Sequence, residues 1–339
     1  MPTETPPATL PNGTPLALPR VGLGTAPLGN ILAIVPEPDA EATFEAAWAG
    51  GIRYFDTAPY YGRGIAENRL NRFLRGRPRD SYVLSTKVGR WLKRTTPDKM
   101  VGITKYFGTP SREVIYDYTY DGVMRSIEHS LERLGIDRVD VLFIHDIDPV
   151  THASDAVSEN HVRDLASSGM KALDELKRSG VTRAIGTGLN ITATTERLVR
   201  ELDLDLVLLA GRYTLLEQGT LDTLYPLCLE RKVGVVAAGV FNSGLLAGGG
   251  TYNYAKAPDD LVARARRLDD VCKRHGVSLP AAAIQFPAHH PAVVSTIFGA
   301  VSAAEVRANL ANLATHAPNA LWRDLKSSGL LDQRAPVPC

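Results

Sequence analysis

The 339-residue chain has few of the residues that mark several classes of protein. Its three cysteines, Cys228, Cys272 and Cys339, are too few and too far apart for a disulfide framework or a zinc site. The 38 basic and 37 acidic residues leave a formal charge of +1 and form no basic face or tail. No apolar stretch approaches the roughly 18 residues of a membrane span. We therefore expect a cytoplasmic protein with no nucleic-acid or membrane partner.

The chain does have eight short apolar runs that alternate with helical patterns. Runs rich in Val, Ile and Leu without strict alternation are typical of parallel strands buried on both faces. Eight repeats, with no early glycine-rich phosphate turn, predict an α/β fold with a single (β/α)8 TIM barrel rather than a doubly wound sheet. The runs are Arg20–Gly24, Arg53–Asp56, Tyr82–Val88, Val139–His145, Arg183–Leu189, Leu206–Ala210, Val233–Ala238 and Val293–Phe298.

The start of the chain is rich in Pro and Thr and lacks the charged and apolar regions of a signal peptide. We expect residues 1–15 to be a disordered tail and residues 16–339 to be one barrel domain. Three connections that follow strands are long: Gly89–Tyr120, Asp146–Ser168 and Phe241–Leu261. Loops that follow strands lie at the C-terminal face of a barrel, where active sites are built.

Four chemically active side chains fall at or just after the ends of consecutive strands. Asp56 ends the second run and Tyr61 follows it, Lys87 lies at the end of the third, and His145 ends the fourth. Each one alone is also typical of a turn cap, a loop contact, a solvated side chain or a hydrogen-bonded core residue. Because these strand ends converge in a barrel, the combination predicts one catalytic group.

The four residue types suit proton transfer. An ordinary phenol has a pKa of about 10, and we expect the neighbouring ammonium of Lys87 to lower the pKa of Tyr61. Asp56 would hold Lys87 in place. Tyr61 would then be the general base when an alcohol is oxidised and the general acid when a carbonyl is reduced, with His145 orienting the substrate oxygen. None of this requires a metal, and His152, His161, His289 and His290 show no ligand spacing.

The same segments resemble the aldo-keto reductase superfamily, from about Arg20 to Leu313. The resemblance rests on the segments around Asp56, Lys87 and His145 and on Glu67–Leu70, Leu131–Gly135, Asp137–Asp140 and Gly180–Gly186. It implies a (β/α)8 barrel whose mouth binds a nicotinamide cofactor, NAD or NADP, that exchanges a hydride directly with the substrate.

Three further segments resemble the aldose dehydrogenase branch of that superfamily: Ala210–Gln218, Val240–Leu246 and the tail from Leu321 to Leu331. The resemblance implies oxidation of the C1 hydroxyl of an aldose of the L-fucose or D-threo type to the lactone. Alternatives are the oxidation of pyridoxal by a pyridoxal 4-dehydrogenase and a broad aldehyde or ketone reductase. From another class comes a non-catalytic, cofactor-sensing regulatory subunit.

The resemblance also points to cofactor contacts, although the chain departs from the usual pattern at Gly188, Ala210 and Ala238. NADP-binding relatives place Lys and Arg where this chain has Gly299 and Glu305, and a carboxylate repels the 2′-phosphate, so we expect NAD. Arg307 lies close enough in sequence to weaken this argument. The expected cofactor residues are Gly24, Thr25, Asn190, Arg212, Phe241, Ser243, Leu245, Gly299, Ser302, Glu305 and Asn309.

Aromatic residues in the mouth loops suit a sugar ring, although aromatics also simply pack loops. We expect Tyr60, Trp91 and Phe107 to contact the substrate, with Tyr252 and Tyr254 nearby. The expected partner is a small molecule, and the expected assembly is a monomer or a small homo-oligomer.

Overall fold

The computed structural model describes residues 6–100 and 105–338, which contain a closed barrel of eight parallel strands. Around the barrel the order is β10-β11-β14-β3-β4-β5-β8-β9, and β9 pairs with β10 to close the ring. The predicted fold class is confirmed, and each expected strand is present within two residues of its predicted start. The strands are β3 (Val21–Gly24), β4 (Tyr54–Asp56), β5 (Val83–Val88), β8 (Val141–His145), β9 (Ala184–Leu189), β10 (Leu206–Ala210), β11 (Gly234–Ala238) and β14 (Val293–Gly299).

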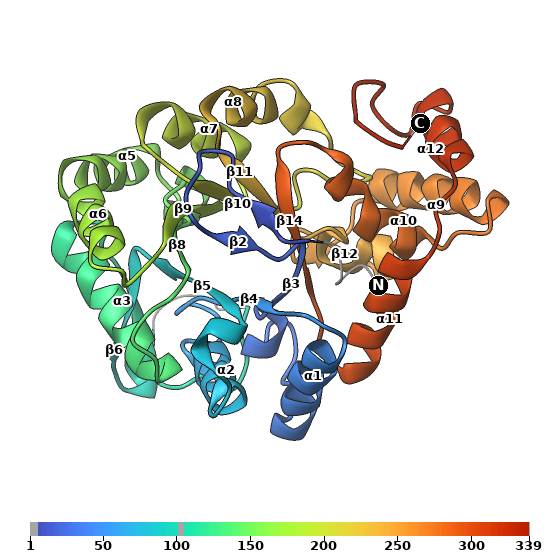
Figure 1. The fold of residues 1–339 in the computed structure, drawn as a ribbon. Helices are drawn as coiled ribbons and strands as arrows, with labels where there is room; N and C mark the ends of the chain where they lie inside the picture. Colours follow the sequence, from blue (N-terminus) through green and yellow to red (C-terminus); the bar gives the residue numbers. More distant parts are fainter. Residues whose placement is uncertain (1–5, 101–104, 339) are drawn as a thin grey trace.

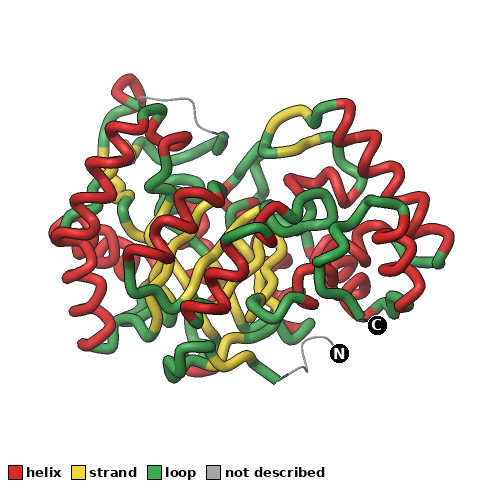
Figure 2. The backbone as a smooth tube through the Cα atoms, turned by 90° about the horizontal axis from the view of Figure 1, so that it is seen from above, coloured by secondary structure: helices red, strands yellow, loops and turns green. Residues whose placement is uncertain are grey.

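Helices surround the strands (Figures 1 and 2). Local sequence signals fix their ends: in α3 the Thr119 side chain accepts a hydrogen bond from Gly122 N, and Gly135, at φ 66°, ends the helix. The helices are α1 (Glu37–Ala49), α2 (Ile65–Leu74), α3 (Tyr120–Leu134), α4 (Pro149–His152), α5 (Asp155–Asp164), α6 (Met170–Arg178), α7 (Thr192–Glu201), α8 (Leu224–Arg231), α9 (Asp259–Arg274), α10 (Leu279–Gln285), α11 (Ala303–Ala314) and α12 (Asn319–Ser327). Among the described residues, no helix combines the length and the apolar character that a membrane crossing requires.

A short N-terminal hairpin closes the end of the barrel opposite the mouth. Strand β1 (Ala8–Thr9) pairs antiparallel with β2 (Ala17–Leu18), and β2 lies across the centre of the ring in Figure 1. Leu10 and Leu16, between the two strands of the hairpin, are buried and belong to one apolar cluster with the side chains inside the barrel. The expected disordered tail over residues 1–15 is therefore wrong from Ala8 onward, because these apolar side chains cover the open barrel end. Residues 1–5 lie outside the described part.

Polar contacts hold this hairpin to the barrel. The buried Asp205, just before β10, accepts hydrogen bonds from Asn12 Nδ2 at 2.6 Å and from Thr14 Oγ1 at 2.7 Å. The same carboxylate pairs with Lys177 Nζ and accepts from Ile185 N. Asp205 therefore ties the start of the chain to the strands near its middle.

The three long connections contain structure of their own at the mouth. The first forms the antiparallel hairpin of β6 (Arg90–Arg94) and β7 (Arg112–Tyr116). The second contains α4 and α5, and the third contains the 3-10 turn η7 (Asn242–Ala247) and the small hairpin of β12 (Thr251–Tyr252) and β13 (Ala255–Lys256).

Candidate active site

Asp56 and Lys87 form a buried ion pair at the ends of β4 and β5. Lys87 Nζ lies 2.9 and 2.7 Å from the two carboxylate oxygens of Asp56 and donates a third hydrogen bond to Thr57 O at 2.8 Å. The Lys87 side chain is 1% exposed, and Ser85 Oγ also donates to Asp56. Burial lowers the pKa of Lys87, while Asp56 favours its charged form. The ion pair therefore lies at the base of the barrel mouth, held in one position by its hydrogen bonds.

Tyr61 lies directly beside this pair. Lys87 Nζ is 4.7 Å from the centre of the Tyr61 ring, so the predicted proximity holds. The predicted lowering of the Tyr61 pKa is wrong. Burial in the mouth, followed by the charge of Asp56, raises the pKa of Tyr61 well above its ordinary value. The physical reason is burial, which keeps water away from the phenolate, while Lys87 donates its hydrogen bonds to Asp56 and Thr57 and not to the phenol.

His145 also lies in the site, next to Tyr61. The side chain is buried at the end of β8, and its ring centre lies 5.9 Å from that of Tyr61. Burial, then the charges of Arg90 and Lys87, lowers the pKa of His145 well below its ordinary value. The imidazole is therefore neutral at pH 7 and offers one N–H donor. Tyr118 supports it from behind by donating to His145 O at 2.6 Å.

The sequence analysis missed a second buried ion pair in the mouth, between Arg90 and Asp146. The Arg90 guanidinium donates to Asp146 Oδ2, with side-chain exposures of 3% and 21%. Asp146 Oδ2 also lies 3.5 Å from His145 Nε2. The available signal was the position of the two residues: Asp146 directly follows His145, and Arg90 lies three places after Lys87. Neither belongs to the motif that drew attention to the site.

Aromatic rings line the mouth, but not all of them were predicted. Tyr60 lies 5.3 Å from Tyr106 and 6.4 Å from His145 by ring centres, and its substrate contact stays a prediction. Tyr106, which the sequence analysis passed over, also lies 6.4 Å from Tyr61. Lys105 Nζ lies 4.5 Å from the ring centre of Tyr254, which joins two mouth loops.

The other two expected substrate residues lie apart from this group. Trp91, in the β6–β7 hairpin, packs against α3: Arg125 lies over its ring and His129 meets it edge to face. That assignment is not supported. Phe107 is 49% exposed, and its backbone N–H bonds to Asn30 O, which places it on the rim. A substrate contact for Phe107 stays a prediction.

The loop after β11 has three consecutive residues with positive φ. Asn242, Ser243 and Gly244 have φ of 46°, 58° and 103°. Asn242 N and Gly244 N donate to Gly239 O and Phe241 O, so the turn is held by its own backbone hydrogen bonds. Ser243 Oγ accepts from Tyr254 N, and Leu245 is buried beneath the loop. Phe241 precedes the turn and is half-buried. A cofactor contact for Phe241, Ser243 and Leu245 stays a prediction.

The expected carboxamide contacts are only partly available. Arg212 donates to Asn190 O at 2.8 Å, to Glu217 and to Asn253 Oδ1, so its guanidinium is engaged by the protein. Its role as a direct cofactor donor is therefore not supported, and it holds the loops together instead. The position of Asn190, directly after β9, keeps it as a candidate.

The start of α11 meets the end of β14 on the same side of the mouth. Ser302 caps the helix, and Glu305 Oε2 accepts from Val301 N at 3.0 Å. Gly299 has no room for a side chain, since a Cβ would lie 2.7 Å from Pro27 Cγ. The remaining expected residues are Gly24 at the end of β3, Thr25, whose hydroxyl donates to Asp56 O, and Asn309, which is buried on α11.

The sequence of the whole barrel agrees with this site. The profile of the Aldo/keto reductase family matches residues 20–328. The chain belongs to the Aldo/keto reductase family. It is therefore an oxidoreductase of a family that works with nicotinamide cofactors.

Two relatives match this aldo/keto reductase along nearly its whole length. It is 42% identical over 327 residues to D-threo-aldose 1-dehydrogenase from a Pseudomonas species, which covers 93% of this chain and 95% of that one. It is also 42% identical over 332 residues to pyridoxal 4-dehydrogenase from Microbacterium luteolum, covering 94% and 96%. Among solved structures, a glycerol dehydrogenase from Gluconobacter oxydans matches with a TM-score of 0.72 and 20% identity, covering 100% of this chain and 98% of that one, which shows the fold alone.

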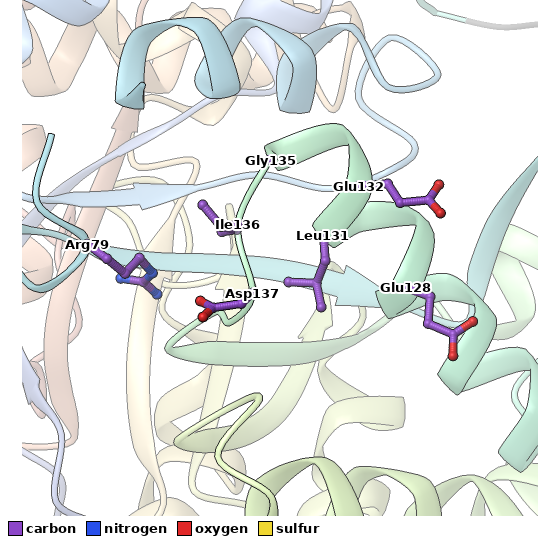
Figure 3. A pocket seen from close by; sticks show the side chains of 7 residues that line it. All are labelled: Arg79, Glu128, Leu131, Glu132, Gly135, Ile136 and Asp137. Carbon is purple, nitrogen blue, oxygen red and sulfur yellow. The ribbon is translucent and has the colours of Figure 1, made fainter. Parts of the chain in front are cut away.

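A separate hollow of this aldo/keto reductase lies away from the mouth (Figure 3). It lies where α3 ends, and Arg79 at its edge is held by Asp140. It contains none of the predicted catalytic or cofactor residues. Its lining residues are Arg79, Glu128, Leu131, Glu132, Gly135, Ile136 and Asp137. Within the described ranges, no group of three or more His, Cys, Asp or Glu side chains could hold a metal ion.

Proposed function

We propose that this protein is an NAD-dependent dehydrogenase that oxidises the C1 hydroxyl of a cyclic aldose to the lactone. The observation that carries the proposal is the grouping of Asp56, Lys87, Tyr61 and His145 in one barrel mouth. The 42% identity to a D-threo-aldose 1-dehydrogenase over 93% of the chain supports an aldose substrate. An L-fucose or D-threo type sugar is the first choice.

The chain's residues handle the proton of this reaction. The C1 hydroxyl binds between Tyr61 and the N–H donor of His145, which fixes the oxygen for reaction. As the C1–H bond breaks, the O–H proton passes to the phenolate form of Tyr61 and the C=O bond forms. A nicotinamide cofactor bound in the mouth would supply the acceptor for the hydride that leaves C1. Lys87, held by Asp56, lies beneath the ring and favours the negative charge on Tyr61 during this step.

NAD rather than NADP is proposed because of Glu305. Its carboxylate already accepts Val301 N–H at the start of α11, where a helix N-terminus would otherwise attract a phosphate. If the adenosine end of the cofactor binds near this helix start, the carboxylate would repel a phosphate on the ribose 2′ oxygen. The β11 loop and Asn190 remain the candidates for the pyrophosphate and the carboxamide.

A pyridoxal 4-dehydrogenase is the second candidate, since the identity to such an enzyme is the same 42%. The rings of Tyr60 and Tyr106 meet edge to face, and a flat pyridine could stack on the face of one of them. A broad aldehyde or ketone reductase and a cofactor-sensing regulatory subunit are weaker alternatives, and the complete catalytic group argues against a subunit without turnover. The cytoplasmic location and the monomeric or small homo-oligomeric state stay predictions.

The deciding experiment follows the formation of the reduced cofactor at 340 nm. Purified protein is given NAD or NADP with L-fucose, D-arabinose, L-galactose or pyridoxal, and Tyr61→Phe is assayed in parallel. The proposal expects turnover of an aldose with NAD and loss of most of that turnover in Tyr61→Phe, with NADH affinity retained. Turnover of pyridoxal alone would favour the second candidate.

A further inference from the structure

The residue that follows His145 has an unusual backbone conformation. Asp146 has φ 39°, in the left-handed region that residues other than glycine rarely adopt. Side chains on successive strand residues normally point to opposite faces, so a regular strand would send Asp146 away from His145. The left-handed turn instead brings Asp146 Oδ2 to 3.5 Å from His145 Nε2. Strain of this kind persists only where the surroundings enforce it, and it is common at functional sites.

The surroundings here are built around Arg90. Its buried guanidinium binds Asp146 Oδ2 and lies 4.5 Å from the ring centre of Tyr60 and 5.3 Å from that of Tyr116. Tyr118 OH donates to Asp146 O at 3.1 Å and thereby holds the turn itself. Arg90 and Tyr118 together therefore hold the Asp146 carboxylate at the edge of the catalytic group.

The second carboxylate oxygen is left for a ligand. Within the described part of the chain, nothing donates a hydrogen bond to Asp146 Oδ1, and the side chain as a whole is 21% exposed. Burial raises the pKa of both Tyr61 and Tyr254, and the charge of Asp146 contributes to each, which agrees with all three facing the same space. A carboxylate held in this way accepts hydrogen bonds from hydroxyl groups and repels anions.

We propose that Asp146, positioned by Arg90, accepts a hydrogen bond from the hydroxyl on the carbon next to the reacting carbon and so selects aldoses over simple aldehydes. This inference rests on the proposed aldose dehydrogenase activity. The reacting oxygen binds at His145 Nε2, and a vicinal hydroxyl lies within one hydrogen-bond length of that oxygen. Asp146 is the acceptor on that side of His145. The same carboxylate disfavours substrates with an acidic group beside the reacting carbon.

A comparison of two sugars tests the proposal in the unmodified protein. L-Fucose and 2-deoxy-L-fucose differ only in the hydroxyl that Asp146 would bind. With NAD present, kcat/KM for L-fucose should exceed that for the deoxy sugar by about tenfold to a hundredfold, as expected for a hydrogen bond to a charged group. Equal values for the two sugars would overturn the proposal, whether or not any variant folds.

The variant Asp146→Asn supplies the second arm. Asparagine tolerates the left-handed backbone, and its oxygen can still face Arg90, which turns an N–H donor toward the sugar. The preference for L-fucose over its deoxy form should collapse toward one, with the thermal midpoint and NADH affinity kept. Asp148→Asn is the matched control, because it removes a buried charge two residues away whose side chain only caps α4, and its preference should equal that of the unmodified protein.

Two other results carry different meanings. If Asp146→Asn lowers kcat/KM equally for both sugars, Asp146 acts only by positioning His145, and the substrate contact is refuted. If the unmodified protein binds NADH and oxidises pyridoxal but none of the aldoses, the proposed function itself has failed, and the Asp146 contact falls with it.

Discussion

The ammonium of Lys87 faces the ring of Tyr61 at 4.7 Å, while its hydrogen bonds go to Asp56 and Thr57. The amine thus supports the aromatic face electrostatically and does not compete for the hydroxyl. The hydroxyl stays available for substrate, and burial keeps it protonated, because the pKa of Tyr61 is raised. A protonated phenol is ready to serve as an acid, whereas service as a base requires that it first lose its proton.

The raised pKa of Tyr61 determines how alcohol oxidation and carbonyl reduction each depend on pH. Because the pKa of Tyr61 is raised, the phenolate fraction at neutral pH is small and grows about tenfold for each pH unit below that pKa. We expect kcat for alcohol oxidation to rise through pH 7–10 without a plateau, and kcat for carbonyl reduction to stay nearly flat. Steady-state rates at saturating cofactor measure both. A plateau in oxidation near pH 7 would contradict the raised pKa.

A second prediction separates the structural from the catalytic part of Lys87. The change Lys87→Met leaves the Asp56 carboxylate buried without its partner and should lower the free energy of unfolding by about 3–5 kcal/mol. The double change of Lys87→Met with Asp56→Leu removes the unpaired charge and should recover most of that stability. Turnover should stay lost in both variants, as urea unfolding and the 340 nm assay would show. An active double variant would show that the ion pair is not needed for catalysis.

The choice between NAD and NADP should respond to the charge of Glu305. Glutamine keeps the acceptor that caps α11 and removes the charge, so Glu305→Gln should improve the Kd for NADPH by about tenfold. Glu305→Lys should improve it further, by adding a cation for the phosphate. Fluorescence titration with NADH and NADPH measures the two Kd values and hence their ratio. Glu132→Lys, an exposed change on α3, is the control and should leave the ratio as it was.

The N-terminal hairpin should make stability depend on acid pH through Asp205. Burial alone would raise the pKa of Asp205, but hydrogen bonds from Lys177, Thr14 and Ile185 N outweigh it, and the pKa is lowered. A lowered pKa stabilises the fold above the ordinary value of about 3.9, and this contribution disappears as the pH falls through the folded-state value.

Asp205→Asn should therefore cost about 1–3 kcal/mol at pH 7 and progressively less below pH 4. Urea unfolding at pH 7, 5 and 3.5 gives the three differences. The exposed Asp203 lies two residues earlier, and Asp203→Asn should change little at any of these pH values. A cost for Asp205→Asn that is constant down to pH 3.5 would contradict the lowered pKa.

The sequence predicted the barrel, and it placed the candidate catalytic residues at strand ends, because both depend on local patterns. A buried parallel strand is a short apolar run, and the first polar residue after it marks the C-terminal edge, as Asp56 and His145 do. Strand order then brings these ends together without further information from side chains.

The features that the sequence did not predict depend on contacts between distant residues. The two-residue strands β1 and β2 are too short to leave a periodic pattern, and their anchor Asp205 lies 191 residues after Thr14. Asp146 was missed because only its left-handed backbone turns it toward His145. The pKa of Tyr61 was predicted with the wrong sign because its burial comes from loops whose conformation the sequence does not reveal.

The closed lower end of the barrel also matters for handling the protein. Since Ala8 to Leu18 cover the end opposite the mouth, anything attached ahead of Ala8 is directed away from the cofactor loop and the aromatic walls. A bead, an electrode or a partner enzyme fused on that side would leave the entrance free for small molecules to diffuse in and out.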